Sequence, residues 1–227
     1  MARIAIIGGG GWGTALALAL GRTRIRHALR LWVYEKDLAE RMQATRMNDL
    51  YLPGFPLPSD VILTSDLAEA LAGAQLVVSA VPARFVCELY RQMLPHLSPQ
   101  MVFVSATKGL EAQSFRRVSE VIEQTIGEKF PPRLAAVSGP TFATEVASSK
   151  PAAAVVASRD AELARELQAE LSSPTFRLYA SSDVTGVEMG GALKNVIAIA
   201  AGVCDGLGLG ANATAALITH GLAEITR

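Results

Sequence analysis

A run of glycines near the N-terminus has the spacing of a phosphate-binding loop. Gly8, Gly10 and Gly13 fit the pattern G-x-G-x-x-G. In that pattern the first glycine permits a tight turn, the second lets the backbone approach a pyrophosphate, and the third lets a helix pack closely on a strand. The N-terminus of the following helix offers free N–H groups and a partial positive charge. The segment therefore predicts a dinucleotide-binding loop rather than a merely flexible turn.

The residues that follow the second predicted strand bear on the choice of dinucleotide. Glu35 lies about 20 residues after Gly13, where an acidic side chain accepts hydrogen bonds from the ribose hydroxyls of NAD. Lys36 is adjacent, and a cation there would instead suit the 2′-phosphate of NADP. The sequence leaves NAD and NADP open, with a slight preference for NAD.

Two lysines lie in segments suited to binding an anion or moving a proton. Lys108 follows the predicted strand Met101–Ala106, and ligands of open α/β sheets bind at such carboxyl ends. Lys194 follows Gly190 and Gly191 in a predicted helix, and helical side chains lean toward the N-terminus, so its ammonium lies over a bare groove. Close helix packing alone would explain the two glycines. A lysine that acts on a ligand is the sharper hypothesis.

Short apolar runs alternate with segments of helical periodicity along the first part of the chain. The predicted strands are Ala2–Ile7, Leu29–Tyr34, Val61–Thr64, Leu76–Val81, Met101–Ala106, Leu134–Ser138 and Ala152–Ala157, and the predicted helices include Thr14–Leu20, Leu38–Met47 and Phe115–Ile126. This alternation predicts an α/β fold with a doubly wound, mostly parallel, Rossmann-like sheet. The stretch Asn48 to Asp60 contains three prolines and is expected to be an irregular loop.

The chain changes character at Val184. From there it is rich in alanine and lacks turn signals until Gly206, and a second helix is predicted from Asn212 to Arg227. Two helices cannot bury their apolar faces alone. We therefore predict a dinucleotide-binding Rossmann domain over residues 1–183 and the beginning of an incomplete, all-helical substrate domain over residues 184–227.

Composition and charge argue against several classes of protein. The 227 residues are 50% hydrophobic and 19% charged, with a formal net charge of +0, as is typical of packed globular domains. Because there is no basic run, nucleic acid is not an expected partner. No apolar run reaches the ~18 residues of a membrane span. Cys87 and Cys204 lie far apart and imply neither a disulfide framework nor a metal site. We expect a cytoplasmic protein without a metal ion.

The motifs resemble those of the bacterial NAD(P)-dependent glycerol-3-phosphate dehydrogenases. The matching segments follow the order found in that family, and the two lysine motifs are more specific than the glycine loop. These segments are GGGGWGTALA from Gly8, WVYE from Trp32, ATKGLE from Ala106, SGPTFA from Ser138, GGALKNVIA from Gly190 and GLGLGAN from Gly206. The family's helical domain continues past the position of Arg227, so we expect a chain truncated within that domain.

The resemblance implies hydride transfer between a nicotinamide and carbon 2 of the substrate, so that dihydroxyacetone phosphate and NAD(P)H give sn-glycerol 3-phosphate for glycerophospholipid synthesis. By the same resemblance Lys194 is the catalytic acid and base, and Asn195 orients it. The implied substrate contacts are Lys108, Gly139, Thr141, Lys194 and Asn195. With the glycine loop and Glu35 included, the expected cofactor contacts are Gly8, Gly10, Gly11, Trp12, Gly13, Tyr34, Glu35, Phe85, Lys108 and Ala143.

A lysine side chain is an acid at neutral pH and a poor base, because its ordinary pKa is about 10.4. Desolvation or a second cation lowers such a pKa. We expect Lys108 to be the second cation beside Lys194.

Two alternatives stay open. A lysine-dependent NAD(P) hydroxyacid dehydrogenase of the 3-hydroxyisobutyrate or 6-phosphogluconate type would act on a carboxylate, which the segments around Lys108 and Ser138 argue against. A catalytically silent nicotinamide-binding fragment would leave Lys194 idle. The long helix from Val184 is expected to expose an apolar face, which favours self-association, as in a homodimer. His220 stands where bacterial relatives usually have arginine, and we expect a surface or interface change.

Overall fold

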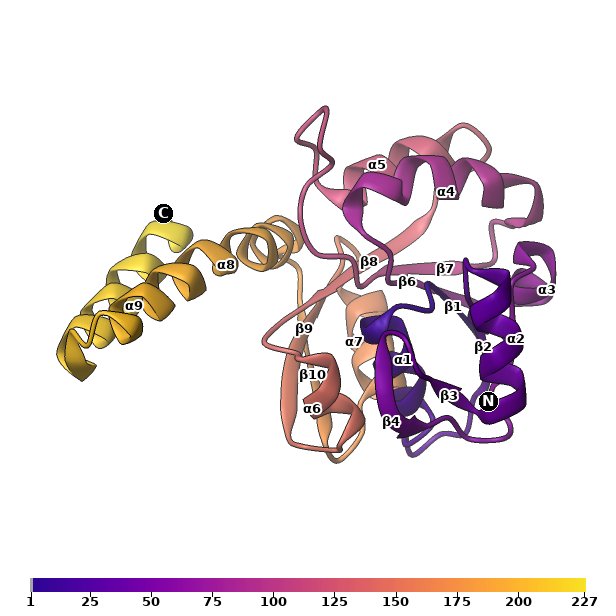
Figure 1. Cartoon of the computed structure of the whole chain (residues 1–227). Helices are drawn as coiled ribbons and strands as arrows, with labels where there is room; N and C mark the ends of the chain where they lie inside the picture. Colours follow the sequence, from indigo (N-terminus) through magenta and orange to yellow (C-terminus); the bar gives the residue numbers. More distant parts are fainter. Residues whose placement is uncertain (1) are drawn as a thin grey trace.

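The protein is an α/β fold built on one eight-stranded sheet, as the computed structural model of residues 2–227 shows (Figure 1). The strand order is β10-β9-β8-β7-β6-β1-β2-β5. The strands are β1 (Arg3–Ile7), β2 (Ala28–Trp32), β5 (Ile62–Thr64), β6 (Leu76–Ser79), β7 (Val102–Ser105), β8 (Arg133–Ser138), β9 (Ala152–Ala157) and β10 (Phe176–Ser181). Neighbours from β5 to β8 pair in parallel, whereas β8 and β9 are antiparallel. The predicted fold class, a mostly parallel doubly wound sheet, is confirmed.

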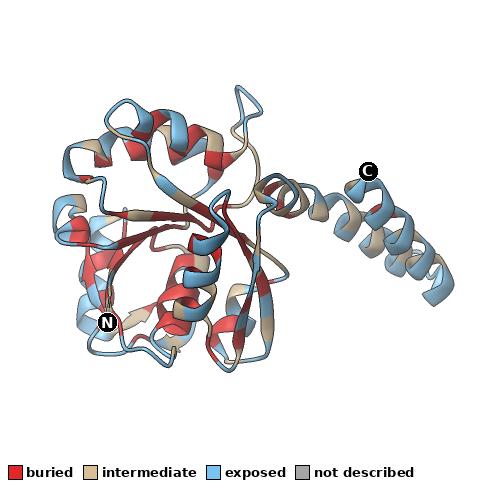
Figure 2. Ribbon diagram, turned by 180° about the vertical axis from the view of Figure 1, so that it is seen from behind, coloured by how far each residue is buried: buried red, intermediate tan, exposed pale blue. Residues whose placement is uncertain are grey.

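Helices cover both faces of the sheet and enclose two apolar layers (Figure 2). In β1, Ile4 and Ile6 belong to one layer, and Ala5 and Ile7 belong to the other. One face is covered by α1 (Gly11–Leu20), α2 (Lys36–Thr45), α6 (Ala143–Ala147) and α7 (Ala161–Leu171), and the other by α3 (Leu67–Leu71), α4 (Val86–Met93) and α5 (Val118–Gly127). Burial on both faces explains why the central strands are continuously apolar in sequence.

The predicted strands and helices all form, with small shifts at their ends, but one strand of the eight-stranded sheet was missed. This strand, β10, lies at the edge of the sheet and pairs in parallel with β9. Its buried Phe176 and Leu178 alternate with the exposed Arg177 and Tyr179. Such alternation is typical of a strand with one covered face, which a search for continuous apolar runs does not find.

The prediction of an irregular loop from Asn48 to Asp60 is wrong in part. Here β3 (Met47–Asn48) pairs antiparallel with β4 (Leu52–Pro56). Prolines are tolerated in a small two-stranded sheet because its outer edges need no N–H donor. Gly54 adopts φ 85°, which glycine allows, and Leu52 anchors the pair in the core.

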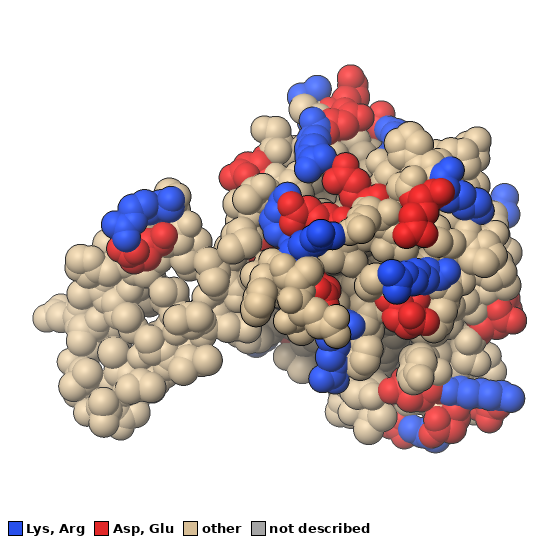
Figure 3. Space-filling model, turned by 90° about the horizontal axis from the view of Figure 1, so that it is seen from above, with Lys and Arg blue, Asp and Glu red and all other residues tan. Residues whose placement is uncertain are grey.

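Two long helices, α8 (Val184–Gly206) and α9 (Gly210–Thr226), pack on each other and project from the sheet (Figure 1). They correspond to the two predicted helices. Gly221 permits their close approach, because a Cβ there would collide with Ile197. Most of their outer surface is exposed (Figure 2), and seen from above it is almost uncharged (Figure 3). His220 is exposed on α9, which is consistent with the expected surface or interface change at this position.

The length of α8 corrects one expectation. By length and composition alone this helix could cross a membrane, whereas the sequence was expected to contain no stretch long enough. Length and composition are weak evidence, since long core helices share them. The first half of α8 contacts the sheet domain through Glu188, Gly191 and Lys194, as a helix of a globular domain does.

Candidate active site

The glycine loop lies between the carboxyl end of β1 and the N-terminus of α1. Gly8 has φ 124°, and a Cβ on Gly13 would collide with the carbonyl oxygen of Gly8, so both positions require glycine. By contrast, nothing lies within 4 Å of the position that a Cβ on Gly10 would take. No side chain caps the N-terminus of α1 at Gly10. The loop thus offers open space and free N–H groups that fit the pyrophosphate of a dinucleotide.

Asn48, which the sequence analysis assigned to an irregular loop, holds this glycine loop in place through hydrogen bonds. Its side chain is fully buried, and Nδ2 donates to the carbonyl oxygen of Gly9 and to Oγ1 of Thr14, both at 2.8 Å. Its Oδ1 accepts the backbone N–H of Tyr51 at 2.9 Å. A Cβ on Gly11 would lie 2.7 Å from the carbonyl oxygen of Tyr51, so the β3–β4 turn also packs against the loop.

Glu35 follows β2 and precedes the first residue of α2, at the position predicted for a ribose contact. The phenol of Tyr51 donates a hydrogen bond of 2.7 Å to Glu35 Oε1, and this bond raises the pKa of Tyr51. Tyr34 is 77% exposed beside it, with its ring edge-to-face against Trp32. Lys36 is exposed. The structure therefore holds the carboxylate of Glu35 in place and leaves Lys36 at the surface.

Trp12, a predicted cofactor contact, also has a structural role. Its indole N–H donates to the carbonyl oxygen of Ala106 at 3.0 Å, and its ring packs edge-to-face on Phe176. The side chain thus fastens α1 to the end of β7, which leaves its backbone N–H at the helix N-terminus to face a ligand. Phe85 is half-exposed under the guanidinium of Arg84, and Ala143 begins α6.

The predicted substrate residues meet at the same edge of the sheet. Lys108 Nζ donates to Thr141 Oγ1 at 3.0 Å, and Lys194 Nζ donates to the carbonyl oxygen of Gly139 at 3.3 Å. Thr141 Oγ1 lies 3.5 Å from that carbonyl oxygen. The segments after β7 and β8 and the helix α8 thus bring both ammonium groups to one turn. Asn195 is exposed and makes no side-chain hydrogen bond within residues 2–227, so its orienting role stays a prediction.

The electrostatics of this cluster favour an anionic ligand. Burial and the neighbouring Lys194 ammonium together lower the pKa of Lys108 to about 8. Lys108 was expected to act as the second cation beside Lys194, whereas the lysine whose pKa is lowered is Lys108 itself. A phosphate placed between two such cations would relieve their repulsion and favour the charged form of Lys108. Lys108 Nζ also lies 5.3 Å from the ring centroid of Trp12, which connects this cluster to the glycine loop.

The two adjacent glycines of α8 have different roles. A Cβ on Gly191 would collide with Ser138 Oγ, so this glycine allows α8 to approach the end of β8. Nothing lies within 4 Å of the corresponding position on Gly190. Close packing therefore accounts for Gly191, whereas the space beside Gly190 is open and the groove expected near Lys194 stays a prediction.

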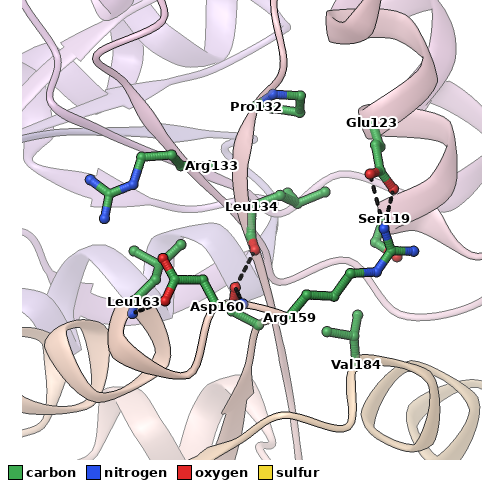
Figure 4. A pocket seen from close by; sticks show the side chains of 10 residues that line it. Ser119, Glu123, Pro132, Arg133, Leu134, Arg159, Asp160, Leu163 and Val184 are labelled. Atoms are coloured by element: carbon green, nitrogen blue, oxygen red, sulfur yellow. Dashed lines mark hydrogen bonds and ion pairs between the residues drawn. The ribbon is translucent and has the colours of Figure 1, made fainter.

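A separate cleft of about 210 Å³ lies at the opposite edge of the sheet, where β8 begins (Figure 4). Its charged side chains are already paired: Arg159 Nη1 lies 3.0 Å from Glu123 Oε1, and Asp160 caps the N-terminus of α7. It contains neither lysine of the cluster. Within residues 2–227, no group of three or more His, Cys, Asp or Glu side chains could hold a metal ion.

Comparisons with known proteins find related sequences over nearly the whole chain. Residues 3–164 match the family described as NAD-dependent glycerol-3-phosphate dehydrogenase N-terminus, and residues 183–227 match the C-terminus of the same family. The chain is 59% identical over 227 residues to the glycerol-3-phosphate dehydrogenase (NAD(P)+) of Koribacter versatilis, and it spans 100% of its own length and 67% of that protein.

A second relative and a solved structure extend the comparison. The chain is 50% identical over 224 residues to the enzyme of the same name from Syntrophotalea carbinolica, across 99% of its own length and 67% of that protein. It superimposes on the crystal structure of glycerol-3-phosphate dehydrogenase from Coxiella burnetii with a TM-score of 0.89 and 41% identity, covering 100% of this chain and 68% of that one. The chain therefore belongs to the family of NAD-dependent glycerol-3-phosphate dehydrogenases.

Proposed function

We propose that this protein interconverts dihydroxyacetone phosphate and sn-glycerol 3-phosphate with NAD(P)H, and that it works in the cytoplasm to supply glycerol 3-phosphate for glycerophospholipid synthesis. The observation that carries this proposal is the meeting of Lys108 and Lys194 at the turn of Gly139 and Thr141. Two ammonium groups at one turn suit a substrate with both a phosphate and a carbonyl group.

In the proposed mechanism Lys194 moves the proton. During reduction its ammonium donates a proton to the oxygen on carbon 2, and during oxidation its neutral amine removes the hydroxyl proton. A bound dinucleotide supplies or accepts the hydride. General acid and base catalysis of this kind contributes about 10² to 10⁴ in rate. Lys108 and Thr141 hold the substrate, because a protonated Lys108 that already contacts Thr141 presents its remaining N–H donors to an anion.

We propose that the dinucleotide lies along the glycine loop, with its pyrophosphate at Gly10 and the N-terminus of α1. Gly8 and Gly13 shape the turn, Gly11 and Trp12 offer backbone N–H groups, and Tyr34, Glu35, Phe85 and Ala143 surround the ligand. Glu35 favours NAD over NADP, because its carboxylate is fixed by Tyr51 and would repel a 2′-phosphate.

We also propose that residues 1–183 form the dinucleotide-binding domain and that residues 184–227 begin the helical substrate domain. Asp183 caps α8 through a 2.8 Å hydrogen bond from the N–H of Gly186, which supports a boundary at this point. The exposed apolar residues of α8 and α9, among them Val196 and Ile199, support self-association. Sedimentation of the chain at several concentrations tests this last point.

The experiment that tests the function is a titration with NADH, followed by the fluorescence of Trp12 and Trp32, without and with saturating dihydroxyacetone phosphate. We expect NADH to bind and the phosphate substrate to tighten its binding. 3-Hydroxyisobutyrate is the control for the alternative hydroxyacid dehydrogenases, and it should have no effect. If NADH binds but dihydroxyacetone phosphate changes nothing, the chain is only a nicotinamide-binding fragment. If NADH does not bind, the glycine loop has no cofactor role here.

A further inference from the structure

Glu188 is a buried carboxylate that the proposed chemistry does not use. It lies on α8, less than two turns before Lys194, and it is 6% exposed. A buried carboxylate is costly unless it is paired and hydrogen-bonded. Its surroundings therefore indicate what it does in the fold.

Both oxygens of Glu188 are bound to the N-terminus of α5. Oε1 accepts the backbone N–H of Ser119 at 2.8 Å, and Oε2 accepts the Ser119 hydroxyl at 2.5 Å and an Nη1 hydrogen of Arg117 at 3.3 Å. Burial raises the pKa of Glu188, whereas Ser119 and Arg117 lower it and Glu120, a nearby carboxylate, raises it further. The carboxylate from α8 thus caps α5 at the positive end of its dipole.

Arg117 connects this contact to Lys108. Leu110 and Arg117 form an isolated β-bridge, and the N–H of Glu111 donates to the carbonyl oxygen of Arg116 at 2.9 Å. The segment from Lys108 to Arg117 is therefore a closed loop, with Lys108 near one end and Arg117 at the other. Fixing Arg117 fixes the base of the loop from which Lys108 extends.

On α8, the contacts with the sheet domain stop near Lys194. Within residues 2–227 the pair of Arg117 and Glu188 is the only ion pair between α8 and the rest of the protein. Gly191 packs on Ser138 and Lys194 reaches Gly139, but Val196 is already 63% exposed. Glu188 is thus the charged anchor of the half of α8 that carries Lys194.

We propose that Glu188 is a positioning residue that sets the distance between Lys194 and Lys108, by holding α8 against the loop that begins at Lys108. The effect of Glu188 on turnover rests on the proposed function, whereas its effect on the distance between the two lysines does not. Without the anchor, α8 is held only by packing and by the Lys194 hydrogen bond, and the two ammonium groups move apart.

The direct readout is the pKa of Lys108, measured on the whole chain by an NMR pH titration of its side-chain Cε and Nζ signals. Its pKa is lowered to about 8, in part by the Lys194 ammonium. Glu188→Gln keeps the size of the side chain but removes its charge. We expect the pKa of Lys108 to rise by about one pH unit or more in this variant, because the Lys194 ammonium no longer lies beside it.

Three further variants make the result interpretable. Lys194→Met removes the neighbouring ammonium directly and should raise the pKa of Lys108 at least as far. Glu123→Gln breaks an exposed ion pair on α5 with Arg159 and should leave the Lys108 pKa unchanged. Ser119→Ala removes one hydrogen bond to Glu188, and it should shift the pKa of Lys108 in the same direction by less. This milder variant decides the question if Glu188→Gln does not fold.

In kinetic terms, Glu188→Gln should raise the KM for dihydroxyacetone phosphate about tenfold while the Kd for NADH is unchanged, since only the substrate side of the site is displaced. An unchanged Lys108 pKa in both Glu188→Gln and Ser119→Ala would overturn the positioning role. So would an unchanged Lys108 pKa in Lys194→Met, since the two lysines would then not be neighbours. If the Lys108 pKa rises as expected but dihydroxyacetone phosphate is not reduced by the unmodified protein, the proposed function fails and the positioning role stands.

Discussion

Asn48 Nδ2 donates a hydrogen bond of 2.8 Å to the carbonyl oxygen of Gly9, inside the glycine loop. The same amide group reaches Thr14 on the first turns of α1, so one buried side chain fixes both the loop and the helix that follows it. A phosphate-binding loop needs a fixed backbone, because its N–H groups must point at the ligand before it arrives. Asn48 thus links the β3–β4 pair to the loop that we propose binds the dinucleotide.

Replacing Asn48 by alanine should weaken both folding and cofactor binding. The substitution leaves the buried carbonyl of Gly9 without this partner, which costs about 1–3 kcal/mol of unfolding free energy. We expect the Kd for NADH to rise about tenfold, because the loop is no longer held in its binding conformation. Urea denaturation and NADH titration measure the two effects. Asn212→Ala, an exposed asparagine on α9, is the matched control, and an equal loss in both variants would contradict the bracing role.

Lys194→Ala should separate catalysis from cofactor binding. Turnover should fall about a hundredfold or more, because the proton donor to the carbonyl oxygen is lost. The Kd for NADH should stay nearly unchanged, since Lys194 contacts the turn at Gly139 and not the glycine loop. Lys150→Ala removes an exposed lysine and should change neither quantity. Near-normal turnover of Lys194→Ala would exclude the acid and base role.

The sequence predicted the parts of the candidate site that directly follow central strands or lie on a helix. The glycine loop, Lys108 and Thr141 all follow central strands, and the carboxyl ends of parallel strands meet at one edge whatever the loops do. Lys194 was found because two glycines in a helix need an explanation. Each of these features has a local pattern, which can be identified without knowledge of tertiary contacts.

The residues that were missed act through tertiary contacts. Asn48 lies in a proline-rich stretch where an irregular loop was expected, and nothing local shows that its amide reaches Gly9. Glu188 was overlooked beside the glycines of α8, because its partners on α5 are distant in the sequence. The one signal available for Glu188 was an acidic residue within a mostly apolar helix, which is unusual unless the charge is paired.

The affinity for dihydroxyacetone phosphate should fall as the pH rises through about 8. The proposed contact of Lys108 with the anion requires its protonated form, and burial and the Lys194 ammonium lower the pKa of Lys108 to about 8. Below this pH Lys108 is protonated and the affinity for the anion is at its highest. Above it, Lys108 must take up a proton when the anion binds, and this uptake weakens the observed affinity. A titration of dihydroxyacetone phosphate with NADH present, from pH 6.5 to pH 9.5, measures the change. Lys108→Arg keeps its charge over this range, so it should bind with little pH dependence. A flat profile in the unmodified protein would contradict the assignment.

Tyr51 and Glu35 should together set the preference for NADH over NADPH. The phenol of Tyr51 holds one oxygen of the Glu35 carboxylate at 2.7 Å, so the carboxylate is fixed where the ribose hydroxyls would lie. In Tyr51→Phe this restraint is lost, and NADH affinity should fall about threefold to tenfold, the size expected for the loss of one typical hydrogen bond. In Glu35→Gln the repulsion of the 2′-phosphate is removed, so NADPH should bind more tightly while NADH binds less tightly. The ratio of the two Kd values, measured by tryptophan fluorescence, is the readout. Glu40→Gln, which removes an exposed carboxylate farther along α2, is the control and should leave this ratio unchanged. If Glu35→Gln also leaves it unchanged, the choice between the two cofactors is made elsewhere on the protein.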